Sequence, residues 1–156
     1  MGVGKTAIGS RLAIRLGYHF LDSDAQIEKN NQCTISEIFK NKGESYFRQL
    51  ETQFLESLRE VNNSVIATGG GALTIPGNLE ILKDCGKLIY LNVDLEKIIE
   101  RIMRNKRRPL VQTENPIETI KELYEKRKHL YEQADIIINT GSMGQQRIVS
   151  EIIRNI

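Results

Sequence analysis

The sequence has few cysteines and no long apolar run. Only Cys33 and Cys85 occur in 156 residues, far apart and without CxxC spacing or histidine partners, which argues against a disulfide framework and against a zinc site. No apolar run approaches the ~20 residues that cross a bilayer, and the glycine-rich amino terminus does not resemble a secretory signal. We therefore expect a cytoplasmic protein with reduced thiols and no membrane partner.

The sequence also lacks an excess of charge of either sign. Its 22 basic and 20 acidic residues leave a net charge of +2, which is too balanced for a nucleic-acid-binding surface. Any positive charge that serves function must therefore be local. Repeats and low-complexity tracts are absent as well, and the length fits one domain over residues 1–156.

Short apolar runs alternate with longer amphipathic stretches along the chain. We expect strands at 18–21, 64–67, 88–93 and 136–138. Amphipathic periodicity predicts helices at 8–16, from the capping-box pattern at 34–37, after Gly43 as far as Val61, at 95–105, at 117–133 and at 145–156. Strands separated by helices indicate a three-layer α/β fold with a parallel sheet, which binds ligands beyond the carboxyl ends of its strands.

The segment Gly2-Val3-Gly4-Lys5-Thr6 matches the second half of a Walker A phosphate loop. Glycines let the backbone curl so that N–H groups point at phosphate oxygens, and the following helix adds its positive end. Lys5 would contact the β- and γ-phosphates, and the Thr6 hydroxyl would bind Mg²⁺. This segment predicts an ATP-binding protein.

The full Walker pattern is G-x-x-x-x-G-K-[ST], and its first glycine would precede Met1. The buried strand that normally comes before a phosphate loop is also missing from the sequence. That strand is usually interior in a parallel sheet, and its absence would leave backbone groups of its neighbours unpaired. We therefore expect either that the sequence is shortened at its amino terminus or that the chain starts at Met1 and folds poorly.

Two carboxylates and two arginines are further candidates for chemistry. Asp22 and Asp24 are two residues apart, so on an extended segment both would face the same way. One could support Mg²⁺ and the other could accept a proton from an attacking hydroxyl, although helix N-capping is the alternative. Arg48 and Arg127 could together bind a carboxylate in a bidentate manner, although each could equally be a solvated helix charge.

Taken in order along the chain, these residues resemble the shikimate kinase family over essentially the whole length. The matching blocks are Gly2-Val3-Gly4-Lys5-Thr6, Leu21-Asp22-Ser23-Asp24, Gly43-Glu44 with Phe47-Arg48, Gly69-Gly70-Gly71-Ala72, Arg108-Pro109-Leu110, and Arg127 ahead of Leu130-Tyr131. The resemblance implies ATP-dependent phosphorylation of the shikimate 3-hydroxyl. It also implies a P-loop fold like that of nucleoside monophosphate kinases, with a five-stranded parallel sheet whose first strand is missing here.

The resemblance also implies a role for each matching residue. Lys5, Asp24 and Arg108 would be catalytic, with Asp24 as the base that also grips a substrate hydroxyl. ATP would be bound by Gly2, Val3, Gly4, Lys5, Thr6, Ala7, Arg101 and Arg108; shikimate by Asp24, Arg48, Gly70, Gly71 and Arg127; and Mg²⁺ by Thr6 and, through water, by Asp22. A substrate-binding subregion would span about 24–52, and a lid loop about 105–116.

Besides the missing first strand and first Walker glycine, one further departure and two rival functions accompany this resemblance. The loop at 139–144 lacks the arginine that many family members carry on the adenine side. One rival is a P-loop kinase for another hydroxylated metabolite, similar to gluconate kinase. The other is a non-catalytic protein that binds a nucleotide or a partner without turnover. The expected protein is a monomer that binds shikimate and ATP and does not bind nucleic acid.

Overall fold

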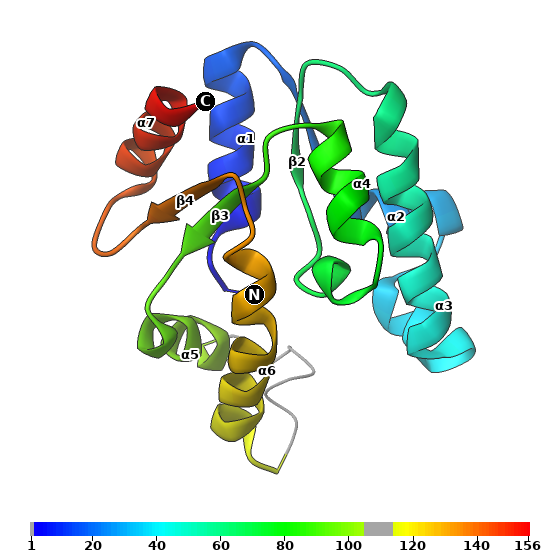
Figure 1. The fold of residues 1–156 in the computed structure, drawn as a ribbon. Coiled ribbons are helices and arrows are strands. Elements are labelled where there is room, and N and C mark those ends of the chain that lie inside the picture. Colours follow the sequence, from blue (N-terminus) through cyan, green and yellow to red (C-terminus); the bar gives the residue numbers. More distant parts are fainter. Residues whose placement is uncertain (1, 105–113) are drawn as a thin grey trace. The chain divides into compact units, whose positions relative to one another are not determined.

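The computed structural model describes residues 2–104 and 114–156 of the chain. Helices and short parallel strands alternate along these residues (Figure 1). No helix in these ranges is both long and apolar enough to cross a membrane. The elements are α1 (Lys5–Leu16), β1 (His19–Asp22), α2 (Ser23–Asn31), α3 (Ile35–Ser57), η1 (Leu58–Glu60), β2 (Ser64–Ala67), η2 (Ala72–Thr74), α4 (Asn78–Cys85), β3 (Ile89–Asn92), α5 (Leu95–Met103), α6 (Pro116–Tyr131), β4 (Ile136–Asn139) and α7 (Gln145–Asn155).

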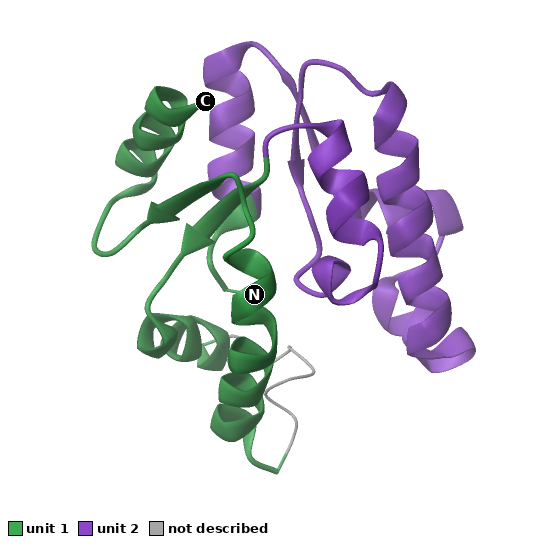
Figure 2. Cartoon of the chain, viewed as in Figure 1, with its two compact units in different colours: residues 1–5, 88–156 green, residues 6–87 purple. Residues whose placement is uncertain are grey.

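The chain forms two compact units, which are coloured separately in Figure 2. Unit 1 contains Met1–Lys5 and Leu88–Ile156, and unit 2 contains Thr6–Lys87. Each unit contains one pair of parallel strands, β3 with β4 in unit 1 and β1 with β2 in unit 2. The predicted parallel α/β arrangement is therefore confirmed within each unit.

In unit 2 the pairing of β1 with β2 brings two loops to the same end of the sheet. The register runs from His19 opposite Ser64 to Asp22 opposite Ala67. Because the strands are parallel, the residues that follow Asp22 and those that follow Ala67 leave the sheet at the same end. The predicted aspartates, at the end of β1 and the start of α2, therefore lie beside the loop with the glycine triplet.

Helix α1 approaches this sheet closely because Gly9 has no side chain. A Cβ atom at Gly9 would lie 2.8 Å from Cε2 of Phe20 on β1, a distance at which the ring or the helix would have to move. Gly17 ends α1 with a left-handed φ of 69°, as predicted for a C-cap. Gly9 therefore allows α1 to pack closely against β1, and Gly17 determines where the helix ends.

Helix α3 follows the predicted pattern of a short helix, a glycine and a longer helix. Thr34 and Glu37 form the capping box at its start, where backbone and side-chain hydrogen bonds from Thr34 lower the pKa of the Glu37 carboxyl. Gly43 interrupts the helix with φ 80° and ψ 173°, a conformation that is essentially confined to glycine. The prediction that the helix continues to Val61 is wrong, because α3 ends at Ser57 and is followed by the 3₁₀ turn η1.

Unit 1 is organised around an apolar cluster that includes the start of the chain. Val93, Ile98, Ile102 and Ile120 are buried together, and Val3 packs against them. The strand register runs from Ile89 opposite Ile136 to Asn92 opposite Asn139. The predicted helices of this half of the chain are confirmed within one or two residues at most ends. Val3 thereby holds the glycine-rich segment against the core of the unit.

Candidate active site

The glycine-rich segment at the start of the chain has the curled backbone expected of a phosphate loop. Gly2 and Gly4 both have left-handed φ values, 67° and 86°, which glycine adopts without strain. Helix α1 begins at Lys5 and has no acidic residue in its first turn, so no residue of the helix itself offsets the positive end of its dipole. Arg101, which was predicted to lie against adenine, donates a hydrogen bond from Nη1 to the Gly2 carbonyl at 3.3 Å.

Thr6 and Asp22 are in direct contact within unit 2. The Thr6 hydroxyl donates to Oδ2 of Asp22 at 2.8 Å, which leaves the lone pairs of its oxygen available to a ligand. Oδ1 of Asp22 accepts from the backbone N–H groups of Asp24 and Ala25 at 3.1 and 3.4 Å, and so caps α2. Mg²⁺ prefers oxygen ligands, and the hydroxyl and carboxylate oxygens of this pair fit that preference.

The predicted extended arrangement of Asp22 and Asp24 is wrong. Asp22 ends β1, whereas Asp24 lies in the first turn of α2, a helix that the sequence pattern did not indicate. The helix forms because the Asp22 carboxylate satisfies two of its unpaired N–H groups. Asp24 is nevertheless brought to the glycine triplet, since a Cβ atom at Gly69 would lie 3.0 Å from its Oδ1.

Ser23 connects Asp24 to the glycine loop, which we define as residues 69–71. Its buried hydroxyl accepts a hydrogen bond from the Gly69 N–H at 2.8 Å and lies 3.4 Å from Oδ1 of Asp24, as a donor to it. One side chain therefore fixes the spacing between a candidate base and the loop predicted to bind substrate.

Arg48 is held between two carboxylates on its own helix. It pairs with Glu44 at 2.9 Å and with Glu51 at still shorter range, and the Glu51 side chain is only 2% exposed. Partial burial disfavours the charged guanidinium, but the hydrogen bonds that it donates to Glu51 and Glu44 outweigh this effect and raise the pKa of Arg48. The guanidinium is therefore a permanent, oriented positive charge.

The Arg48–Glu51 pair fits against the glycine loop only because positions 69 and 71 have no side chains. A Cβ atom at Gly71 would overlap Nη1 of Arg48 and lie 2.7 Å from its Cζ. A Cβ atom at Gly69 would overlap Oε1 of Glu51. Glycine was expected here as a residue that lets substrate approach the backbone. Glu51 was not predicted, although its spacing of three residues from Arg48 on an expected helix was an available signal.

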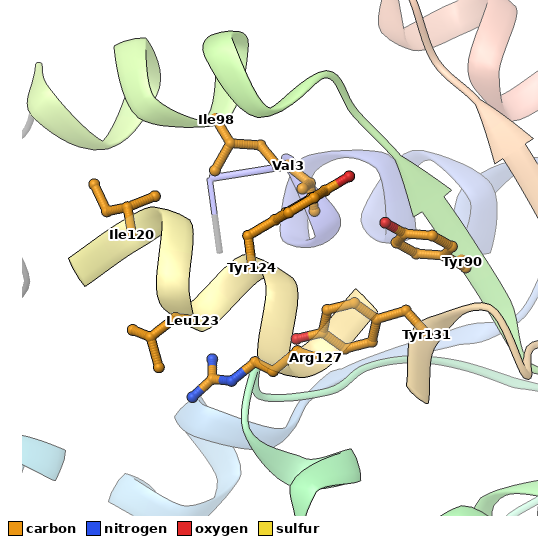
Figure 3. Close-up of a pocket in the computed structure, with 8 residues that line it drawn as sticks. All are labelled: Val3, Tyr90, Ile98, Ile120, Leu123, Tyr124, Arg127 and Tyr131. Atoms are coloured by element: carbon orange, nitrogen blue, oxygen red, sulfur yellow. The ribbon is translucent and has the colours of Figure 1, made fainter. Parts of the chain in front are cut away.

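Arg127 lies in unit 1 beside a small pocket lined by aromatic side chains (Figure 3). The pocket has a volume of about 40 Å³, and Tyr90, Tyr124 and Tyr131 contribute rings to it. The rings of Tyr90 and Tyr131 are 5.4 Å apart. Burial, followed by the influence of Tyr124, raises the pKa of the Tyr90 hydroxyl. The residues that line the pocket are mostly uncharged. The Arg127 guanidinium points away from the Tyr90 ring.

The predicted site residues therefore fall into three groups. Unit 2 brings together Thr6 with Asp22, and Asp24 and Arg48 with the glycine loop. Unit 1 contains the phosphate-loop residues as far as Lys5, together with Arg101 and Arg127. Arg108 and most of the predicted lid loop lie outside the described residues. Joint binding of one carboxylate by Arg48 and Arg127 stays a prediction.

The sequence is similar to known proteins over its full length. The family model described as shikimate kinase matches residues 1–156. A shikimate kinase from Persephonella marina is 42% identical over 156 residues, which is 100% of this chain and 94% of that protein. A shikimate kinase from Bartonella quintana is also 42% identical over 100% of this chain, which corresponds to 74% of its own length.

Solved structures agree with the sequence comparison. Shikimate kinase from Acinetobacter baumannii, in complex with shikimate, superposes with a TM-score of 0.92 at 41% identity, covering 99% of this chain and 87% of that one. Shikimate kinase from Aquifex aeolicus gives a TM-score of 0.88 at 35% identity, covering 99% and 90%. With a family match over every residue and relatives well above 30% identity, the chain belongs to the shikimate kinase family.

Proposed function

We propose that this chain transfers the γ-phosphoryl group of ATP to the 3-hydroxyl of shikimate. The main support is the match to the shikimate kinase family over residues 1–156, together with a structural relative at 41% identity whose structure contains shikimate. In the reaction the hydroxyl oxygen forms a bond to the γ-phosphorus while the bond from that phosphorus to ADP breaks. The hydroxyl proton leaves to a base or to solvent.

The described residues suit the acceptor half of this reaction. Shikimate carries a carboxylate, and Arg48 offers an oriented guanidinium at the glycine loop. We propose that Arg127 is the second carboxylate-binding arginine and that the backbone of Gly70 and Gly71 borders the substrate. Asp24, beside Gly69, would grip the reacting hydroxyl and accept its proton. A loose transition state makes little demand on proton removal, so Asp24 would orient the hydroxyl as well as accept its proton.

The donor half rests on the phosphate loop. Gly2, Val3, Gly4, Lys5, Thr6 and Ala7 would surround the phosphates of ATP, with Lys5 as their point charge. Thr6 and, through water, Asp22 would hold Mg²⁺, which neutralises charge on the transferring group when bound. We assign Arg101 to the adenine side, and we assign Arg108 to the lid from the sequence alone. Action as a cytoplasmic monomer is part of the same proposal.

A panel of acceptors distinguishes this function from its rivals. We expect ADP release with Mg²⁺, ATP and shikimate, and no release above background with gluconate or with shikimate lacking its carboxylate. Release with gluconate alone would identify a kinase for another metabolite. ATP binding without turnover on any acceptor would instead support the non-catalytic alternative.

A further inference from the structure

Buried polar side chains gather around the glycine loop. Among the described residues, Ser23, Glu51, Asn78 and Thr140 are polar or charged and buried. Ser23 accepts from Gly69, and Glu51 lies against the same glycine. Thr140 lies in unit 1 and bonds to the Asn92 carbonyl, so three of the four belong to unit 2. Burial of a polar group is costly unless its hydrogen bonds are made, so a concentration of such groups at one loop calls for a reason. Of these three, Asn78 is the one with no place in the proposed chemistry.

The amide of Asn78 is fully buried and bonded at both ends. Its Nδ2 donates to the carbonyl of Ala72 at 2.9 Å, and its Oδ1 accepts from the Thr52 hydroxyl at 3.0 Å. A carbonyl can only accept, so the nitrogen end of the amide must face Ala72. Neither aspartate nor leucine, which match asparagine in size, can make both bonds.

These two bonds connect the two parts of the candidate acceptor site. Ala72 directly follows Gly71, and its own N–H donates to the Gly69 carbonyl at 3.3 Å, so its position constrains the whole glycine loop. Thr52 follows Glu51 on α3 and lies one turn beyond Arg48, whose carbonyl is 3.2 Å from the Thr52 hydroxyl. Asn78 thus bridges the loop to the helix that carries the carboxylate-binding arginine.

We infer that Asn78 is a positioning residue for substrate binding, which acts by fixing the distance between the glycine loop and the Arg48 face of α3. The inference rests on the proposed function. A Cβ atom at Gly71 would overlap the Arg48 guanidinium, so the guanidinium lies directly against the glycine loop and its placement depends on the position of that loop. Loss of the bridge therefore misplaces the acceptor site while leaving the phosphate loop as it is.

Two variants and two controls test this role in the full chain. Asn78→Asp keeps the shape but places a carboxylate oxygen against the Ala72 carbonyl, and Thr52→Val removes the hydroxyl while keeping the branched side chain. Thr52→Ser retains the hydroxyl and is the matched control. Asn155→Asp makes the same exchange at an amide that donates to a backbone carbonyl, that of Glu151 at 2.7 Å in α7.

We expect Asn78→Asp and Thr52→Val to raise the KM for shikimate by about tenfold, the size expected for loss of one buried hydrogen bond. The KM for ATP should stay within about twofold, because only interactions with the acceptor are affected. Thr52→Ser and Asn155→Asp should keep both constants. If Asn78→Asp does not fold, the inference is tested by comparing the KM for shikimate of Thr52→Val with that of Thr52→Ser.

Two outcomes overturn the inference. One is a lower melting temperature in both variants with an unchanged KM for shikimate, which would make the bridge purely structural. The other is an equal change of both KM values and of kcat, which would indicate a general folding defect. The wild-type chain, assayed first, separates the two proposals: its failure to phosphorylate shikimate contradicts the proposed function, whereas normal wild-type activity with unaffected variants contradicts only the role of Asn78.

Discussion

At the scale of single residues, the candidate acceptor site depends on contacts that leave little room for larger side chains. Arg48 pairs with Glu51, and its guanidinium occupies the space that a side chain at position 71 would fill. Asp24 lies beside Gly69 and the hydroxyl of Ser23. Each of these side chains is oriented by a neighbour that does not itself react, so the geometry is set before any ligand binds.

Asp24→Asn tests the carboxylate next to the glycine loop. We expect phosphoryl transfer to fall by about 10²- to 10⁴-fold, the range for loss of a positioned acid–base group. ATP affinity should be retained, because Asn keeps the shape of the side chain. Single-turnover ADP formation and ATP titration measure the two quantities separately. Turnover close to that of the wild type would remove Asp24 from the role of base.

Arg127→Ala tests the second predicted carboxylate ligand. Loss of a charge-assisted pair should raise the KM for shikimate by about tenfold or more, with little change in the KM for ATP. Lys128→Ala, at the next position of α6 and exposed to solvent, is the matched control and should behave as the wild type. Equal increases in both KM values would contradict the assignment of Arg127 to shikimate.

At the scale of elements, helix ends and helix breaks determine where the functional side chains lie. The Asp22 carboxylate starts α2 and thereby turns Asp24 out of the extended backbone. Gly43 breaks α3 and lets the segment with Arg48 and Glu51 take its own direction. Capping and glycine geometry therefore decide the site as much as the strands do.

Gly43→Ala tests the break in α3. No atom lies within 4 Å of a Cβ at this position, yet φ is 80°, so the cost is conformational and not steric. We expect a loss of about 1–3 kcal/mol in the free energy of unfolding, measured by urea denaturation. Gly144→Ala is the matched control, because it has equally open surroundings and an ordinary φ of −69°. A Gly43→Ala variant as stable as this control would show that the break is not strained.

Sequence periodicity was sufficient for the strands and most of the helices, and the ordered motifs were sufficient for the family, but neither revealed several elements of the site. The strand at β3 and the helix at α6 were predicted because their apolar patterns are long and regular. Helix α2 was missed because it is polar and is stabilised by a cap and by packing of Ile27 against Ile38 and Phe47. Glu51 and Asn78 were missed because a sequence pattern does not show which polar side chains fold into the interior.

At the scale of the whole molecule, binding of the acceptor and binding of the nucleotide should each raise the stability of the folded chain. A ligand that binds only the native state stabilises it by about 2.7 kcal/mol at one hundred times its dissociation constant. We expect shikimate and Mg²⁺–ATP each to raise the melting temperature of the chain. Calorimetry with each ligand alone and with EDTA measures the effect, and EDTA should reduce the shift caused by ATP.

The balanced charge of the chain provides a control for this measurement. With a net charge of +2, nonspecific attraction of anions is small, so sulfate at the same ionic strength should give a much smaller shift than ATP. A shift from ATP but none from shikimate would favour a nucleotide-binding protein without acceptor specificity. Equal shifts from ATP and sulfate would indicate general anion binding.

The close packing of Gly9 against Phe20 has a consequence for how such a sequence can vary. Thr6 lies one turn before Gly9 on α1, and its contact with Asp22 depends on how near this helix lies to β1. A methyl group at position 9 would therefore disturb the Thr6–Asp22 contact unless the ring at position 20 moved or became smaller. The two positions should vary together in related sequences, and we expect Gly9→Ala combined with Phe20→Leu to recover activity that Gly9→Ala alone lowers.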